Sequence, residues 1–172
     1  MKKTSSALAA LFVTGFAFAQ DASVQALREI EPASGESLAM IVPAKGVQIY
    51  ECRANQAGAY EWTFVAPQAE LFDTTGKSIG RHYAGPSWES GDGSKIVGAV
   101  KARADAPAAN AIPWLLLNTK SVGGEGSFSK VTSVQRVNTS GGVAPKAGCS
   151  EGNAGTPARV PYSADYYFFT TK

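Results

Sequence analysis

Val160-Pro-Tyr-Ser-Ala-Asp-Tyr-Tyr-Phe-Phe-Thr-Thr171, close to the end of the chain, carries the clearest structural signal in the sequence. Tyr162, Ala164, Tyr166 and Phe168 fall on every second position, which is the side-chain period of a β-strand. Aromatic and β-branched residues also favour strands. The pattern predicts an aromatic strand in the centre of a sheet.

Short segments with the same spacing occur throughout the chain, between its 18 Gly and 9 Pro residues. Such short apolar runs between turn residues are typical of many strands joined by turns. In one of them, Tyr60, Trp62 and Phe64 share a face, which we expect to point inward. The predicted strands before the last one are Gly46–Cys52, Tyr60–Ala66, Ala69–Phe72, Ser78–Tyr83, Lys95–Val100, Ala111–Asn118 and a strand pair within Ser127–Val137.

Two of these segments carry further information. Asp73–Lys77 is a turn signal, so the strands that flank it are predicted to form a hairpin. Ala111–Asn118 is nearly continuously apolar, which indicates burial on both faces, with Pro113 at its start or on an edge. Only Ala22–Ile30 is predicted to be a helix. The three-residue period of Phe128, Val131, Val134 and Val137 would also allow a helical turn, but the β-branched residues and glycine-rich flanks of that segment favour strands. The fold class is therefore all-β with one short N-terminal helix, arranged as a β-sandwich or a partly closed barrel.

The N-terminus has the features of a secretory signal peptide. Lys2 and Lys3 precede an apolar stretch from Ala7 to Phe18, and Ala17-Phe18-Ala19 provides small residues for cleavage after Ala19. We expect residues 1–19 to be the signal peptide, residues 20–172 to form a single β-rich domain, and the mature protein to be secreted or periplasmic. No later segment is apolar over the ~20 residues that a membrane span needs.

The charge and the cysteines of the expected mature chain fit an exported protein. Its 14 basic residues balance its 14 acidic ones, so no electrostatic attraction to nucleic acid is expected. Cys52 and Cys149 are its two cysteines, and a disulfide is the default in an oxidising compartment. Two unpaired thiols are the alternative. One histidine and two distant cysteines make a poor ligand set, so we expect no metal and no cofactor.

The candidate site lies in Gly80–Ser94, which contains the only histidine of the chain, a tryptophan, two carboxylates and several turn residues. His82 could act as a general acid or base with Glu89 or Asp92 as its partner. If the chain turns at Gly85-Pro86, Trp88 folds back towards His82 and forms an apolar wall. The alternatives are a histidine bonded to backbone, a tryptophan in the core, and an ordinary Asp-Gly turn. The candidate ligand-binding residues are His82, Tyr83, Trp88, Glu89 and Asp92.

Arg136 stands out because it lies in an otherwise apolar predicted strand. An unpaired charge in such a position is costly, so an acidic partner across the sheet is expected. Asp165 is similarly embedded in the aromatic strand near the C-terminus. We therefore predict an ion pair between Arg136 and Asp165, with capture of a substrate anion by Arg136 as the alternative.

Five segments together resemble the domain-of-unknown-function 3455 family of exported bacterial and fungal proteins. The similarity spans nearly the whole expected mature chain. It implies a secreted, single-domain protein and carries over no catalytic residues, because none is established for the family. The segments are Gly46–Cys52, His82–Glu89 with Asp92–Ser94, Ala111–Leu117, Val134–Thr139 with Gly141 and Gly142, and Val160–Phe168.

The leading functional hypothesis is an exported, non-catalytic binding or interaction module. Its expected contact surface is the segment from Arg81 to Ser94, and its expected partner is a small molecule or a glycan. Neutral charge, an aromatic and glycine-rich loop, and no recognisable catalytic set support this hypothesis. The alternatives are an extracytoplasmic hydrolase or lyase that uses His82 as acid or base, and a structural protein of the envelope or matrix.

Overall fold

The computed structural model describes the chain from residue 15 to residue 172, and its side chains from residue 22. Most of the expected signal peptide, residues 1–14, lies outside the described residues. None of the helices within the described part has the length and apolar character needed to cross a membrane. The elements in chain order are α1 (Gly15–Glu29), β1 (Glu36–Ala54), β2 (Tyr60–Phe72), β3 (Ser78–Tyr83), β4 (Ser87–Ser90), β5 (Lys95–Ala104), β6 (Trp114–Ser121), β7 (Ser133–Gly141), a short 3-10 helix (Glu151–Asn153) and β8 (Pro157–Thr171).

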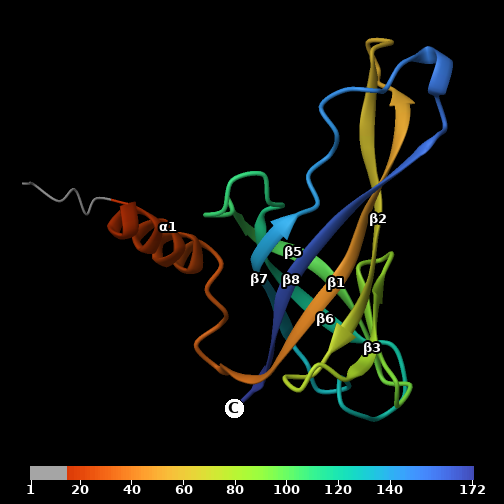
Figure 1. Ribbon diagram of the computed structural model, residues 1–172. Coiled ribbons are helices and arrows are strands. Elements are labelled where there is room, and N and C mark those ends of the chain that lie inside the picture. The colour runs from red at the N-terminus through yellow and green to blue at the C-terminus, as the bar shows by residue number, and fades with distance from the viewer. Residues whose placement is uncertain (1–14) are drawn as a thin grey trace, which may run out of the picture.

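The eight strands form one antiparallel sheet that closes on itself. Each strand pairs with its neighbour in the sequence, and β8 pairs with β1 to complete the ring. The ring is irregular because β1, β2 and β8 are long while β4 has four residues, so the long strands extend well beyond the rest of the sheet (Figure 1). This arrangement confirms the predicted all-β class and the partly closed barrel. The predicted hairpin of β2 and β3 is also confirmed.

The interior of the ring is filled by the inward residues of the strands. The alternation predicted for the last strand is confirmed, since Tyr162, Ala164, Tyr166 and Phe168 are all buried. Phe168 contacts Phe128 edge to face, with ring centroids 4.9 Å apart. Aromatic pairs in this arrangement add to the stabilisation that comes from burying their area.

A second apolar cluster lies on the outside of the sheet, beneath α1. Trp114 and Leu116 of β6 face this cluster, whereas Leu117 faces the interior. This confirms that the apolar run is buried on both faces, and Pro113 directly precedes the strand. Helix α1 contributes Ala26 to the cluster. The helix ends at Glu29, one residue before the predicted end, but it begins at Gly15, earlier than predicted.

The disulfide between Cys52 and Cys149 is confirmed, with Cα atoms 5.3 Å apart. Cys52 lies near the end of β1, and Cys149 lies in the long connection between β7 and β8. The bridge therefore ties this connection to the far end of the long strands (Figure 1). The indole nitrogen of Trp62 adds a second tie, since it donates to the carbonyl of Ala147 at 2.9 Å.

Two sequence predictions about inward faces and strands are wrong. Phe64 is 50 % exposed and Trp62 is only partly buried, because this part of β2 belongs to the extension beyond the closed ring. Ser127–Val137 is not a strand pair, since residues 127–130 form a turn and β7 begins at Ser133. The three-residue spacing of Phe128, Val131 and Val134 belongs to a turn that leads into a strand.

The predicted ion pair between Arg136 and Asp165 is also wrong. In the ladder of β7 and β8, Arg136 lies opposite Tyr166, and Asp165 lies opposite Val137. Side chains of neighbouring strand residues point to opposite faces, so Arg136 and Asp165 face away from each other. Asp165 instead accepts a hydrogen bond from Asn138 at 2.9 Å.

Candidate functional site

The β3–β4 hairpin positions the residues singled out in the sequence. His82 lies opposite Trp88 in its ladder, and Arg81 lies opposite Glu89. Because the side-chain period of a strand is two, the first pair shares the inner face and the second pair shares the outer face. The expected return of Trp88 towards His82 is confirmed, with ring centroids 4.6 Å apart and the ring planes inclined by 20°.

The turn between these strands orients the imidazole of His82. Gly85 has a φ of 135°, a backbone conformation that favours glycine, and a Cβ there would lie 2.6 Å from Ser87 Oγ. Beyond the turn, the carbonyl of Ser87 lies 2.8 Å from His82 Nδ1. A carbonyl only accepts hydrogen bonds, so Nδ1 carries the proton and Nε2 keeps a lone pair.

His82 is buried and electrically neutral. Its side chain packs between Trp88 and Tyr166, whose ring centroid lies 4.9 Å from that of the imidazole. Burial lowers the pKa of His82 to about 3, and the bond to Ser87 offsets only part of this effect. A histidine that stays neutral at physiological pH is a hydrogen-bonding group and an apolar surface, and it is a weak base.

Tyr83 and Glu89 meet on the outer face of the hairpin. The Tyr83 hydroxyl donates to Glu89 Oε2 at 2.5 Å, and Arg81 pairs with Glu89 Oε1 at 2.8 Å. These bonds, that of Tyr83 first, lower the pKa of Glu89. The amine of Lys95 and the guanidinium of Arg81 both lie over the Tyr83 ring, 5.0 Å and 5.3 Å from its centroid. The carboxylate of Glu89 is thus bonded to Tyr83 and Arg81 on the outer face of the hairpin, away from the imidazole of His82.

Asp92 occupies a third environment, the turn between β4 and β5. One carboxylate oxygen accepts from the backbone and hydroxyl of Ser94, and the other accepts from the backbone and hydroxyl of Ser127. The Ser94 hydroxyl in turn accepts from the Phe128 backbone at 3.0 Å. These bonds, those of Ser94 first, place the pKa of Asp92 well below its usual range. Asp92 therefore fastens the Ser127–Phe128 turn to the β4–β5 turn.

The five candidate residues thus divide into three places. His82 and Trp88 lie together inside the ring, Tyr83 and Glu89 lie on its outer face, and Asp92 joins two turns. Within the described residues, the carboxylates of Glu89 and Asp92 bond to other groups and not to His82. The structure therefore brings His82 and Trp88 together, and it does not pair His82 with Glu89 or Asp92 as acid–base catalysis would require.

A cavity of about 320 Å³ opens beside His82 and Trp88, and we call it the inner cavity. All eight strands contribute to its lining, and its rim carries Phe64, Val65 and Val100, which are 50 %, 44 % and 59 % exposed. Concave sites with mostly apolar walls and a few polar groups are the usual form of small-molecule sites. The volume lies at the small end of their range.

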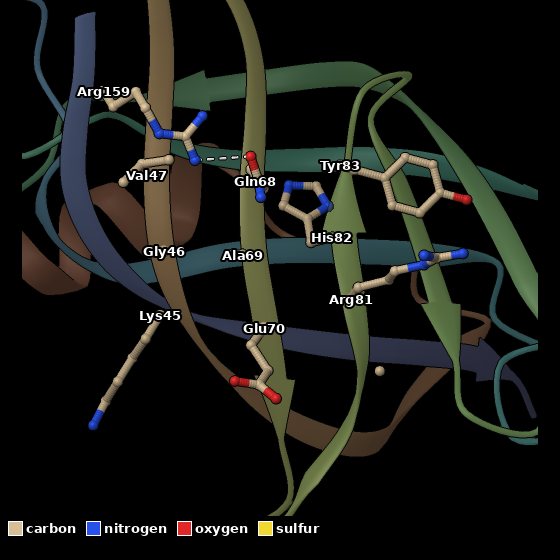
Figure 2. Close-up of a pocket in the computed structure, with 11 residues that line it drawn as sticks. Lys45, Gly46, Val47, Gln68, Ala69, Glu70, Arg81, His82, Tyr83 and Arg159 are labelled. Atoms are coloured by element: carbon tan, nitrogen blue, oxygen red, sulfur yellow. Dashed lines mark hydrogen bonds between the residues drawn. The ribbon is translucent and has the colours of Figure 1, made fainter.

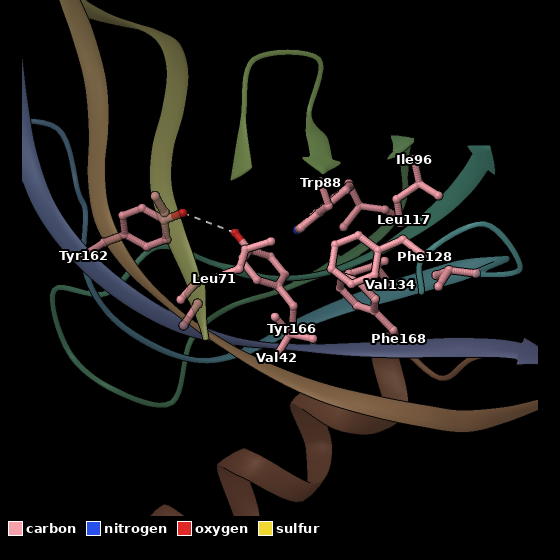
Figure 3. Packing of buried hydrophobic residues seen from close by; sticks show 14 of the residues in the cluster. Val42, Leu71, Trp88, Ile96, Leu117, Phe128, Val134, Tyr162, Tyr166 and Phe168 are labelled. Atoms are coloured by element: carbon pink, nitrogen blue, oxygen red, sulfur yellow. Dashed lines mark hydrogen bonds between the residues drawn. The ribbon is translucent and has the colours of Figure 1, made fainter. Parts of the chain in front are cut away.

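Two buried nitrogen atoms in the lining have no partner within hydrogen-bond distance, Gln48 Nε2 and Trp88 Nε1, although the Gln48 side chain lies near enough to the Tyr162 hydroxyl to lower its pKa. Buried polar groups are nearly always bonded, and an unsatisfied donor costs on the order of 1–3 kcal/mol. In Figure 3 the nitrogen end of Trp88 lies towards Tyr166, and a hydrogen bond joins the hydroxyls of Tyr166 and Tyr162, 3.3 Å apart. The inner cavity is where both unpartnered N–H groups could meet an acceptor.

Gln48 is a site residue that was not predicted from the sequence, whereas Arg136 was considered only in the alternative that it captures a substrate anion. Gln48 is a polar residue on the inward face of β1, and Arg136 is a cation in an apolar strand, so both left a visible signal. Arg136 donates from Nε and Nη2 to the Pro113 carbonyl, at 3.1 Å and 2.8 Å. Burial raises the pKa of Tyr166 and Tyr162, and the positive charge of Arg136 offsets part of this rise.

A second hollow, of about 770 Å³, lies on the outer face of β1, β2 and β3 (Figure 2). Arg159 donates to Gln68 across it at 2.8 Å, and Lys45 and Glu70 extend outward (Figure 2). Its lining combines charged side chains with the predicted site residues His82 and Tyr83, and it contains no unpartnered buried polar atom among the described residues. The inner cavity is therefore the better candidate site. No group of three His, Cys, Asp or Glu side chains suited to a metal occurs in the described part of the chain.

Comparison with protein families matches residues 32–170 with the family described as Protein of unknown function (DUF3455). The match covers β1 to β7, β8 up to its penultimate residue, and the whole lining of the inner cavity. No curated protein and no solved structure matched the chain. The function of this protein is therefore inferred from the geometry of its own residues.

Proposed function

The chain belongs to the DUF3455 family of proteins of unknown function, and we propose from its geometry that it is an exported module that binds a small molecule in the inner cavity. The observation that carries the proposal is the pair of buried, unpartnered donors, Gln48 Nε2 and Trp88 Nε1, in the lining of one mostly apolar cavity. A ligand with acceptor atoms would satisfy both groups. Such preformed sites need little rearrangement on binding.

The geometry supports binding better than acid–base catalysis by His82. The imidazole has no carboxylate partner among the described residues, and its pKa of about 3 keeps it neutral and weakly basic at pH 7. A general base acts best with a pKa near the working pH. In a binding site the same neutral ring supplies a hydrogen-bond acceptor, the lone pair at Nε2.

Export is the second part of the proposal. The charged, apolar and small-residue pattern of residues 1–19 supports a signal peptide, and the disulfide between Cys52 and Cys149 suits an oxidising compartment. Expression in a bacterium with intact export should yield a periplasmic or secreted protein whose N-terminal residue is Gln20. A protein that stays in the cytoplasm with Met1 in place would contradict this part.

Binding is tested by a thermal-shift panel of small carboxylates, amides, phenols and sugars on the purified, oxidised protein. At least one compound should raise the melting temperature, because a ligand that binds only the folded state stabilises it. Val100→Trp should abolish the shift by filling the rim of the cavity. Val122→Trp is the matched control, because Val122 is 52 % exposed and lies outside the lining. A panel without any shift, or shifts that persist in Val100→Trp, would contradict the proposal.

A further inference from the structure

The inner cavity carries a positive charge that no acidic side chain balances. Among the described residues that line it, Arg136 is the only charged one. The two ion pairs among the described residues, Arg53 with Glu51 and Arg81 with Glu89, both lie elsewhere. Arg136 itself donates to the neutral carbonyl of Pro113 and not to a carboxylate. A partly buried cation without a counter-ion is costly, and an anionic ligand would remove that cost.

The groups around Arg136 are suited to an acceptor. Gln48 Nε2 and Trp88 Nε1 are donors without partners, and Tyr166 lies directly opposite Arg136 in the ladder of β7 and β8. His82 adds no charge, because burial lowers its pKa to about 3. The cavity therefore presents a single positive charge beside uncharged N–H groups. Hydrogen bonds between such donors and an ionised acceptor are stronger than those between neutral partners.

The rest of the lining is apolar. Phe64, Val65 and Val100 form the rim, and Leu115 and Leu117 form part of the wall. A sugar would leave several hydroxyls without partners against these side chains. A doubly charged phosphate would leave one negative charge uncompensated, because Arg136 is the only cation in the described lining.

From these observations we infer that the ligand is a small monocarboxylate with an apolar body. Its carboxylate bonds to Arg136 and to the N–H groups of Trp88 and Gln48, and its apolar body packs against the rim. This inference rests on the proposed function, since it names the ligand class of the same cavity. The inference replaces the broad expectation of a small molecule or glycan with one ligand class, apolar monocarboxylates.

The experiment compares three probes of similar shape, benzoate, benzamide and benzyl alcohol, by isothermal titration calorimetry of the oxidised protein at pH 7. Benzoate should bind at least ten-fold more tightly than benzamide, which corresponds to about 1.4 kcal/mol. Arg136→Gln should remove this preference, and Arg136→Lys should keep part of it, because a positive charge remains. Arg159→Gln is the matched control, since that cation lies on the outer face and should leave the preference unchanged.

The outcomes separate the inference from the proposed function. Benzamide or benzyl alcohol binding as tightly as benzoate would overturn the carboxylate inference and leave a small-molecule cavity intact. No binding by any probe, together with no thermal shift in the broader panel, would overturn both. The comparison of probes on the unchanged protein decides the question even if an Arg136 variant fails to fold.

Discussion

The indole of Trp88 stacks on the imidazole of His82, and both rings pack against Tyr166, whose centroid lies 5.4 Å from that of Trp88 and 4.9 Å from that of His82. Three strands thus contribute one aromatic cluster at the wall of the inner cavity. Because this cluster is buried, its properties are measured through the stability of the protein and through the binding of ligands that enter the cavity.

The first prediction concerns pH. The pKa of His82 is about 3 in the folded protein and near 6.5 in the unfolded chain, so the unfolded state binds a proton first as the pH falls. The free energy of unfolding should be constant above pH 6.5 and should fall below it by up to about 1.4 kcal/mol for each pH unit. Urea unfolding at several pH values between about 7.5 and 5 measures this slope.

The matched variant for this prediction is His82→Phe, which keeps an aromatic ring beside Trp88 and cannot titrate. His82 is the only histidine, and the carboxylates with lowered pKa, such as Glu36 and Asp92, protonate only at more acidic pH. Most of the slope between about pH 6.5 and 5 should therefore disappear in the variant, and the small remainder comes from carboxyls that begin to bind protons in the unfolded chain near pH 5. An equal slope in both proteins would show that His82 is not buried in its neutral form.

The second prediction concerns Gly98, which leaves room for the Trp88 ring. A Cβ at this position would lie 2.8 Å from Trp88 Cζ3 and 3.2 Å from Leu117 Cδ2. Gly98→Ala should lower the free energy of unfolding by about 1–3 kcal/mol, as over-packing of a core does. It should also change the tryptophan fluorescence. Gly35→Ala is the control, because a Cβ there meets open space; equal losses in the two variants would refute the packing argument.

The third prediction concerns the disulfide, which closes a segment with a sequence separation of 97 residues. Replacing Cys52 and Cys149 with Ser should lower the free energy of unfolding by about 2–5 kcal/mol, since the unfolded chain is no longer cross-linked. Denaturant unfolding of the oxidised protein and of the double variant measures the difference. Ligand affinity should be unchanged, because neither cysteine lines the inner cavity. A loss of stability below about 1 kcal/mol would contradict the prediction.

The fourth prediction separates Asp92 from the binding site. Asp92→Ala should lower the melting temperature, because the carboxylate joins turns 35 residues apart, and it should leave ligand affinity unchanged. Asp73→Ala is the control, since the Asp73 carboxylate accepts hydrogen bonds from Thr75 and Lys77 of its own turn, and this variant should lower the melting temperature less. Loss of ligand binding in folded Asp92→Ala would place this residue in the site.

Local patterns in the sequence predicted most of the fold. The period of two in Tyr162–Phe168 and the unbroken apolar run around Leu116 depend only on neighbouring residues, and both predictions are confirmed. The ion pair of Arg136 with Asp165 failed because it needed the register between two strands. A shift of one residue in register moves a side chain to the opposite face, and a single sequence does not reveal it.

The candidate site was predictable only in part for the same reason. His82 and Trp88 are joined by one short turn, so their meeting followed from local pattern. Gln48, Arg136 and Tyr166 come to the cavity from β1, β7 and β8, and their approach depends on closure of the whole ring. For Gln48 and Arg136, the sequence signal was a polar residue on the inward face of a strand.

The most direct test of the inner cavity is an NMR titration that follows the indole N–H resonances of Trp88, Trp62 and Trp114 in the ¹⁵N-labelled, oxidised protein. Trp88→Phe assigns the resonance, and benzoate, benzamide and benzyl alcohol are added in turn. At least one probe should shift the Trp88 resonance together with the Gln48 side-chain amide, while the other two indoles stay in place. A Trp88 resonance that does not move with any probe would contradict the existence of a ligand site in this cavity.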